Sequence, residues 1–382
     1  MQKKKKRKRN LDFSSALYLG NWQLDDQSFG VKGLSTGKPL IMAEPLASQM
    51  MAERLAGMQG LGSGLLYPST LHLFWDLFNF FSLYPIAVFV DENAYPIARW
   101  GMERGKLKGK IIQPFAHRDV NSLKKIIGKF YSSGIKPIVV ADGFCPQCGK
   151  ASPLHSYLEI IQPLNGLLII DDTQGIGILG RRPTSGNPYG YGGGGTLPWL
   201  GIQNENVLAG SSLAKAFGIP MAILGGSLKL ISHIKRQSLM RVHCSPPSLL
   251  TVEGARQIFS LNKKEGDRRR SQLLKRVYLF QSGLKKHGIR TTRSFFPVQS
   301  LKGMNGSLIQ AIFEKLKQEG IQCFLTRNHV FHPEITFIIR SDHSLEEVEE
   351  LANLIVKIIN KIDSSGIFSY KWVKNTGYEY FQ

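Results

Sequence analysis

The chain has 382 residues, a length that exceeds one simple core and favours two domains. Hydrophobic residues make up 42% and charged residues 20%, values that are ordinary for a soluble globular protein and exclude a largely disordered chain. Lys and Arg number 49 against 28 Asp and Glu, which gives a formal net charge of +21 and a surface that attracts anions.

A run of basic residues opens the chain. Seven of them stand between Lys3 and Arg9, and removing these seven from the net charge of +21 leaves +14. Like charges at this density repel one another, so we predict a solvated tail over residues 1–10. The basic body could also attract nucleic acid, an anionic membrane surface or a coenzyme A thioester, and these alternatives stay open.

The four cysteines are too few for a disulfide scaffold. Cys145 and Cys148 form a C-x-x-C pair, but a structural zinc site of this type needs a second pair, and Cys244 and Cys323 stand alone. We therefore predict that this pair stands in a loop and binds no metal. A redox-active thiol pair is the alternative. Because no apolar segment follows the basic run, we predict no signal peptide and a cytoplasmic location.

The first predicted elements form an irregular arm over residues 11–60, which ends in a helix from Ala47 to Met58. The apolar stretch Leu65–Val90 is interrupted by Asp76, Asn79 and two prolines. It therefore predicts a buried helix and a strand, and not a membrane span.

Strands and helices then alternate. Three continuous apolar runs that each end in an acid predict buried strands at Pro85–Asp91, Lys136–Asp142 and Gly166–Asp172. Helices are predicted between them at Ser122–Ser133 and Leu154–Ile161. This alternation is typical of a parallel sheet covered on both faces. In such sheets the ligand lies beyond the carboxyl ends of the strands, where these acids stand.

The remainder predicts a glycine-rich surface loop over residues 183–196, a helical region Pro247–Lys286 with a basic face, and a small α+β unit. The elements of that unit are a helix at Ser307–Gly320, strands at Gln322–Thr326 and Glu334–Arg340, and a helix at Ser344–Ile362 that opens with a capping box. We assign the domains as a tail (1–10), an arm (11–60), a large domain (61–250), a linking helix (251–286) and a small domain (287–382).

Two segments carry residues suited to chemistry. Leu167–Gly180 is a buried strand that delivers two aspartates into a glycine-rich turn, and Ala209–Gly218 places Lys215 among small and apolar residues. A lysine that loses its solvent has a lowered pKa and becomes a usable amine nucleophile. A carboxylate about 40 residues earlier can hold a pyridine nitrogen protonated, which makes a cofactor ring an electron sink.

Together these segments resemble the α-oxoamine synthase group of the pyridoxal-phosphate-dependent fold-type I enzymes. Four ordered motifs over roughly residues 30–360 carry the resemblance. They are Phe115-Ala-His-Arg-Asp119, Ala141-Asp-Gly with Ala151-Ser-Pro-Leu154, Asp171-Asp-Thr-Gln-Gly-Ile-Gly-Ile-Leu-Gly180 and Ser211-Ser-Leu-Ala-Lys-Ala-Phe-Gly218. The resemblance implies an α/β fold with a large, mainly parallel sheet domain and a small α+β C-terminal domain.

The resemblance also implies roles for single residues. Lys215 would bond pyridoxal 5'-phosphate and move protons at the substrate, and Asp171 would pair with the pyridinium nitrogen. Ser212 would contact the phosphate, and Tyr95 would stack on the ring in place of the family's histidine. Gln174 would contact the cofactor's 3-oxygen, where the family has a histidine.

Other positions depart from the family pattern. The chain between His72 and Tyr95 is some twenty residues shorter than the pattern, and the missing piece includes a turn whose amides help to bind the phosphate. Thr336 stands where the family has the arginine that binds the substrate carboxylate. Arg340, four residues further along the predicted strand, is the candidate replacement.

The predicted function is the condensation of an amino acid with an acyl thioester in biosynthesis, carried out by a homodimer. The alternatives are transamination, or a protein that keeps this fold and has lost turnover. Nucleic-acid binding through the tail and the Lys263–Arg270 cluster ranks last, because no recognised nucleic-acid motif accompanies these charges.

Overall fold

The computed structural model describes residues 10–25, 30, 33–104, 110–132, 134–327 and 332–364. All but the last residue of the predicted basic tail therefore lie outside the described residues. The chain divides into two units. The larger contains the described parts of Leu19–Pro146 and Lys150–Ser271, and the smaller contains those of Met1–Tyr18, Gln147–Gly149 and Gln272–Gln382.

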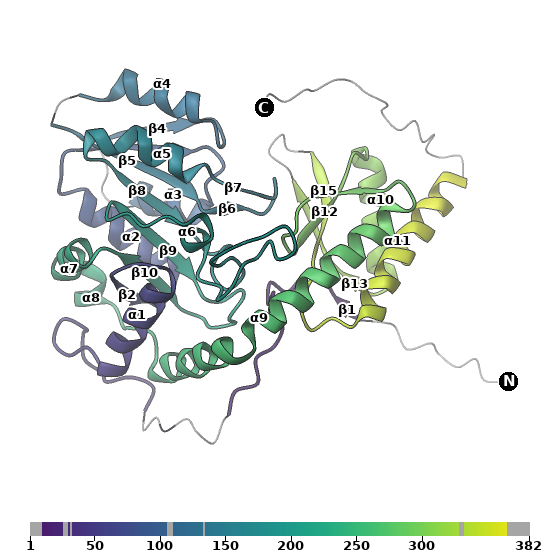
Figure 1. The fold of residues 1–382 in the computed structure, drawn as a ribbon, viewed down its shortest axis with the longest axis horizontal. Coiled ribbons are helices and arrows are strands. Elements are labelled where there is room, and N and C mark those ends of the chain that lie inside the picture. The colour runs from purple at the N-terminus through teal and green to yellow at the C-terminus, as the bar shows by residue number, and fades with distance from the viewer. Residues whose placement is uncertain are drawn as a thin grey trace. The chain divides into compact units, whose positions relative to one another are not determined.

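A seven-stranded sheet forms the centre of the larger unit (Figure 1). Only β10 runs against its neighbours, and the neighbour pairs among β9, β8, β5, β3 and β4 are all parallel. The predicted mainly parallel sheet is therefore confirmed. In sheet order the strands are β2 (Ser63–Tyr67), β10 (Ala222–Gly226), β9 (Val207–Ser212), β8 (Leu167–Asp171), β5 (Lys136–Asp142), β3 (Ile86–Asp91) and β4 (Ile111–Phe115).

Helices cover both faces of this sheet because its strands are apolar on both sides. Side chains of α2, α3 and α7 pack on one face, and those of α4, α5 and α6 pack on the other. The helical segments up to Lys285, the last of which continues into the smaller unit, are α1 (Leu46–Met58), α2 (Thr70–Phe81), α3 (Pro96–Arg104), α4 (Val120–Phe130), α5 (Leu154–Ile161), η2 (Gln162–Leu164), α6 (Thr196–Leu200), α7 (Leu228–Gln237), α8 (Leu239–His243) and α9 (Leu249–Lys285).

Local sequence explains how these helices begin and pack. Ser69 caps α2 by accepting a hydrogen bond from the amide of His72, and Asp119 caps α4 in the same way. A β-carbon at Gly101 would lie 2.8 Å from Phe74, so the glycine lets α3 approach α2 closely. No helix among the described residues has both the length and the apolarity that crossing a membrane requires.

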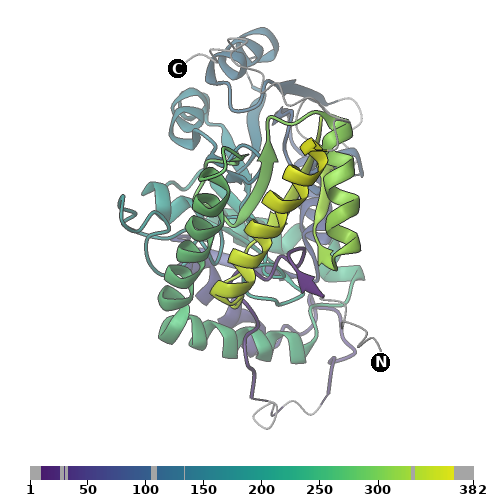
Figure 2. The same cartoon turned by 90° about the vertical axis from the view of Figure 1, so that its right-hand side faces the viewer.

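The smaller unit has a four-stranded sheet in the order β11 (Arg290–Thr291), β12 (Val298–Lys302), β15 (Pro333–Ile338) and β14 (Phe324–Arg327). Helices α10 (Gly306–Gln318) and α11 (Leu345–Ser364) lie side by side (Figure 2). The predicted capping box is confirmed, because Ser344 and Glu347 exchange hydrogen bonds of 2.7 and 3.0 Å. This unit matches the predicted small α+β domain.

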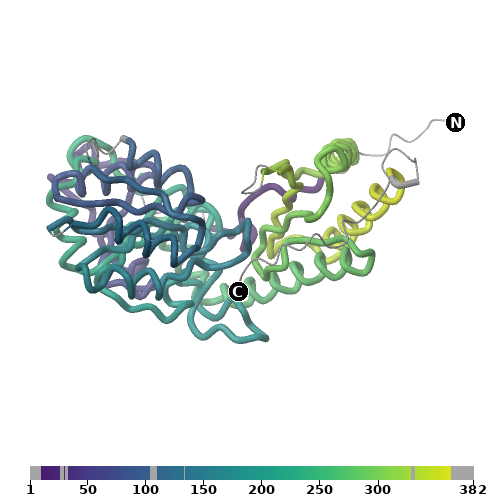
Figure 3. The backbone as a smooth tube through the Cα atoms, turned by 90° about the horizontal axis from the view of Figure 1, so that it is seen from above, coloured from purple at the N-terminus to yellow at the C-terminus, as the bar shows by residue number. Residues whose placement is uncertain are grey.

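The beginning of the chain joins the smaller unit. Strand β1 (Leu11–Asp12) pairs with β13 (Ile321–Gln322), and the backbone of Phe13 bonds to that of Ile338. Figure 3 shows this early segment, in purple, beside the much later strands in green. The sequence missed this pairing, because a two-residue strand leaves no periodic pattern.

Most predicted elements are confirmed, and their differences have physical reasons. The strand Lys136–Asp142 and the helix Leu154–Ile161 match β5 and α5. The prediction of one strand over Gln322–Thr326 is wrong, because the segment forms two strands. Of these, β13 pairs with β1 and β14 pairs with β15. The predicted strand to Arg340 is too long: β15 ends at Ile338, and Arg340 lies beyond it.

Candidate active site

Acidic side chains gather at one edge of the large sheet. Asp91, Asp142 and Asp171 are the last residues of β3, β5 and β8, which are parallel neighbours. Asp142 and Asp171 stand opposite each other in register. The edge predicted from the strand ends therefore exists, because parallel strands deliver their carboxyl ends to one side.

Lys215 reaches this edge from the turn that follows β9. Loss of solvent around its ammonium group lowers the pKa of Lys215, and the negative charges of Asp171 and Asp142 oppose that shift. Its Nζ lies 5.7 Å from the centre of the Tyr95 ring. The structure thus brings together Lys215, Asp171 and Tyr95, three residues that the sequence singled out.

Asp171 is buried, with 5% of its surface exposed, and is fixed by the turn after β8. Its carboxylate accepts a hydrogen bond of 3.0 Å from the amide of Thr173, whose hydroxyl accepts one of 2.9 Å from the amide of Ser212. Burial raises the pKa of Asp171, although the Thr173 hydrogen bonds and Lys215 oppose the rise. A carboxylate held in this way gains most from a cationic partner.

Asp142 belongs to the site, although the sequence analysis gave it no role. Its Oδ1 accepts a hydrogen bond of 3.0 Å from the amide of Tyr95, which fixes the backbone that carries the aromatic ring. Burial and the nearby charge of Asp171 raise the pKa of Asp142. Its position as the acid that ends a buried strand was the available signal.

Asp172, the next residue, stabilises the turn that follows β8. Its carboxylate accepts hydrogen bonds from the amide and the hydroxyl of Thr196. Glycines surround it, since β-carbons built at Gly143, Gly175 and Gly195 would lie within 2.5 Å of its oxygens. Burial raises the pKa of Asp172 to about 7, against the opposing hydrogen bonds of Thr196.

The N-terminus of α2 lies at the same edge of the sheet. Strand β2 runs against β10, which runs against β9, so the carboxyl ends of β2 and β8 face the same way. Near the start of α2, the side chains of Leu73 and Phe74 would lie 3.0 and 3.1 Å from a β-carbon built at Gly210, the residue opposite Asp171 in register. The sequence analysis found no phosphate-binding turn between His72 and Tyr95. The first turn of α2, which begins at Thr70 just before that segment, is a candidate for this contact.

The other predicted site residues are placed as follows. Ser212 ends β9, and its hydroxyl accepts a hydrogen bond of 3.3 Å from the amide of Ala214. Gln174 is half-buried in the turn after Asp171. Arg340, in the smaller unit, forms ion pairs of 2.9 Å with Asp12 and 3.0 Å with Asp342.

Thr336, where the resembling family has its carboxylate-binding arginine, is buried in the smaller unit. Its hydroxyl shares hydrogen bonds with those of Ser300 (2.8 Å) and Thr326 (2.7 Å). This side chain is therefore occupied by contacts within its own sheet.

Solved structures share this fold at low sequence identity. A serine palmitoyltransferase from Sphingomonas wittichii matches with a TM-score of 0.80 and 14% identity, over 93% of this chain and 88% of that one. An 8-amino-7-oxononanoate synthase from Francisella tularensis matches with a TM-score of 0.68 and 15% identity, over 92% and 98%. The predicted fold-type I architecture is confirmed.

Sequence comparison finds relatives of the same kind. The 8-amino-7-oxononanoate synthase of Cellvibrio japonicus is 25% identical over 273 residues, and that of Thermosipho melanesiensis is 24% identical over 235 residues. The matches cover 70% and 62% of this chain but only 65% and 56% of the relatives' own length. These relatives confirm the predicted resemblance to the α-oxoamine synthase group.

A family-level match covers most of the chain. The sequence model of the family described as aminotransferase class I and II matches residues 87–355. This range holds the three strand-end acids, Lys215 and most of the smaller unit. The chain therefore belongs to the aminotransferase class I and II family.

Proposed function

We propose that this protein is a pyridoxal-phosphate-dependent transferase that condenses an amino acid with an acyl thioester. The observation that carries the proposal is the meeting of Lys215, Asp171 and Tyr95 at the carboxyl edge of the sheet. Relatives named 8-amino-7-oxononanoate synthase and serine palmitoyltransferase support the reaction class.

The residues present fit pyridoxal phosphate. Lys215 offers an amine whose lowered pKa makes the nucleophilic, uncharged form more abundant near neutral pH. Asp171 is a buried carboxylate whose raised pKa favours pairing with a cation such as a pyridinium nitrogen. When bound, the cofactor supplies an electron sink for the charge that develops at the substrate carbon.

The chain's own side chains then have separate tasks. Lys215 would hold the cofactor, and its amine would take and return the proton at the substrate α-carbon. Asp171 would pair with the ring nitrogen, and the amide and hydroxyl of Thr173 fix the orientation of its carboxylate. Tyr95 offers a ring face beside the lysine, and Asp142 positions Tyr95 through its amide. Gln174 can donate to the 3-oxygen.

The phosphate is proposed to bind at the start of α2. The amides of the first turn of a helix, together with the helix dipole, attract anions. Ser212 ends β9, which is separated from β2 by β10 alone, and it offers a hydroxyl at the same edge of the sheet. This assignment replaces the phosphate turn that the sequence lacks after His72.

An absorbance titration tests the cofactor. The purified chain with added pyridoxal phosphate should develop a new band near the visible edge, because a lysine–cofactor bond extends the conjugated system. Lys215→Ala should lack the band, and Lys264→Ala, a control at an exposed lysine, should keep it. A band of equal intensity in Lys215→Ala would refute the proposal.

One specific observation favours the alternative that turnover has been lost. Thr336 is hydrogen-bonded to Ser300 and Thr326. Arg340 forms ion pairs with Asp12 and Asp342. Both side chains that the sequence offers for the substrate carboxylate are therefore engaged within the smaller unit. An assay with several amino acids and acyl-CoA donors separates the cases. Cofactor binding without release of free CoA would favour the alternative, and formation of a new amino acid from a keto acid would favour transamination.

A second copy of the chain is proposed to cover a groove of about 500 Å³ beside α2 and α3. Leu71 and Trp100 line it and are 43% and 50% exposed, so the groove offers large apolar side chains to a partner. The homodimer should fall apart in Trp100→Glu when its mass is measured by light scattering. A cytoplasmic location is proposed because none of the four cysteines, all of them described, forms a disulfide.

A further inference from the structure

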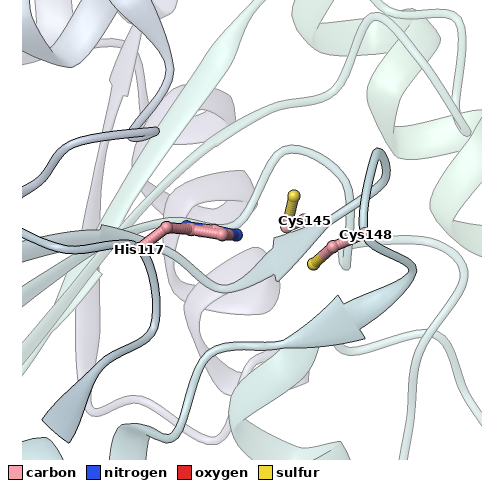
Figure 4. Close-up of side chains that lie close together, drawn as sticks. All are labelled: His117, Cys145 and Cys148. Carbon is pink, nitrogen blue, oxygen red and sulfur yellow. The ribbon is translucent and has the colours of Figure 1, made fainter. Parts of the chain in front are cut away.

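A histidine and the C-x-x-C pair converge at the loops that follow β4 and β5. Cys145 and Cys148 stand on the short hairpin of β6 (Phe144–Cys145) and β7 (Lys150–Ala151), and His117 follows β4. The two sulfurs and an imidazole nitrogen all lie within 4.8 Å of one another. Figure 4 shows the ring of His117 directed toward both sulfurs.

The hairpin itself fixes the spacing of the two thiols. Only two residues separate Cys145 from Cys148, and the strands on both sides of the tip belong to the larger unit. His117 also belongs to that unit, and Cys145 is buried there. Cys148 stands in the tip Gln147–Gly149, which is grouped with the smaller unit, but the pairing of Cys145 with Lys150 on both sides of the tip holds Cys148 near Cys145.

The histidine is oriented as metal-binding histidines are. Asp91 Oδ1 lies 2.8 Å from His117 Nδ1, so the carboxylate fixes the ring and leaves Nε2 as the nitrogen that can bind a metal. Asp91 is fixed in turn by the amides of Asn93 and Arg118, at 2.9 and 3.0 Å. A carboxylate behind a ligating histidine is the usual outer partner in zinc sites.

We propose that His117, Cys145 and Cys148 bind one zinc ion, with water as the fourth ligand. Bonds of about 2.0–2.3 Å in tetrahedral geometry place ligand atoms about 3.3–3.8 Å apart, so small side-chain rotations suffice. Two thiolates and an imidazole select zinc over the hard cations magnesium and calcium. The sequence analysis expected no metal because it sought a second cysteine pair, whereas the third ligand is a histidine 28 residues earlier.

The proposed metal has a structural task beside the active site. The hairpin starts directly after Asp142, and its base is held by hydrogen bonds from Gly143 to Asp171 and from Ser152 to the carbonyl of Asp142. A metal that ties the hairpin to the loop after β4 would fix the backbone on which Asp142 stands. The proposal does not depend on pyridoxal phosphate.

Cobalt titration of the full-length, reduced and metal-stripped protein tests the site. We expect one equivalent of Co²⁺ to produce thiolate-to-cobalt charge-transfer absorption in the near ultraviolet, and one equivalent of Zn²⁺ to abolish it. Cys148→Ala and His117→Gln should each lose tight binding. Cys244→Ala, a control at a half-buried cysteine elsewhere, should behave like the unchanged protein.

Three results would overturn the proposal. The first is the absence of charge-transfer absorption in the reduced, unchanged protein. The second is equal cobalt affinity in His117→Gln, which would leave only a dithiol. The third is a Cys145–Cys148 disulfide, two mass units lighter, in a protein that fails to bind cobalt after reduction. Circular dichroism of each variant ensures that a loss of binding is not a loss of folding.

Discussion

Asp171 and Asp172 are neighbours in the chain, yet they belong to regions that use a buried carboxylate in opposite ways. Both are buried, and burial raises the pKa of each. Asp172 finds its partners inside the turn, in the amide and hydroxyl of Thr196. Asp171 instead faces the lysine and the neighbouring acid, where its charge has no full local balance. A buried carboxylate therefore indicates a binding site when its charge lacks a full set of partners within the protein. Burial alone does not indicate one.

Replacing Lys215 should give the largest effect on chemistry and almost none on folding. Lys215→Ala removes the amine that we propose to hold the cofactor and to move the proton, so activity should fall by at least about 10²–10⁴-fold. The melting temperature should stay unchanged or rise, since a solvent-deprived ammonium group is lost. Steady-state assays and thermal melts measure the two effects, and a large drop in melting temperature would contradict this assignment.

Replacing Asp172 should instead lower the stability of the fold. Asp172→Ala leaves the amide of Thr196 buried without its acceptor, so the free energy of unfolding should fall by about 2–4 kcal/mol. Asp171→Asn should cost much less stability, because the asparagine oxygen can still accept the Thr173 hydrogen bond and Asp142 remains near Lys215. Urea denaturation of the two variants side by side provides the measurement. Equal losses would mean that the two carboxylates have the same role.

The pH dependence of stability should also separate the two aspartates. The pKa of Asp172 is about 7 in the folded chain, whereas an aspartate in an unfolded chain titrates near 4. The folded state therefore holds more protons between pH 4 and 7, and the free energy of unfolding should fall through that window, by about 4 kcal/mol at most. This contribution is complete below pH 4 and lost above pH 7.

Denaturation of the unchanged protein and of Asp172→Asn at pH 5 and pH 8 isolates this effect. The stability advantage of the unchanged protein should be smaller at pH 8, because an asparagine does not titrate. If the two proteins lose stability in parallel between these pH values, Asp172 is already ionised at pH 5.

Arg340→Ala should have the smallest effect on stability. Its pairs with Asp12 and Asp342 are partly exposed, and such pairs contribute about 0.2–1 kcal/mol each. If Arg340 binds the substrate carboxylate, as the sequence predicts, KM for the amino acid should rise at least tenfold. Arg290→Ala, another arginine of the smaller unit, provides the control, and equal KM values would assign Arg340 to its ion pairs alone.

The sequence predicted the parts of the fold that have strong local signals. Long apolar runs ending in an acid gave β3, β5 and β8, and the capping box gave the start of α11. Pairings between distant segments, such as β1 with β13, depend on partners that no local pattern identifies. The same limit applies to function: motif spacing pointed to Lys215 and Asp171 and marked Asp142 only as a strand-end acid, whereas its register against Asp171 and its bond to Tyr95 appear only in the fold.

The glycines around Asp172 imply that this turn evolves as a unit. A methyl group at Gly175 would lie 2.2 Å from the Asp172 carboxylate, and one at Gly143 would lie 2.5 Å from it. The same methyl groups would lie 2.4 and 2.9 Å from the Thr196 hydroxyl, so alanine at either position is incompatible with the whole aspartate–threonine pair. Descendants that change one of these positions should carry compensating changes at the others, so inheritance at residues 143, 172, 175 and 196 should be correlated, with single changes rare.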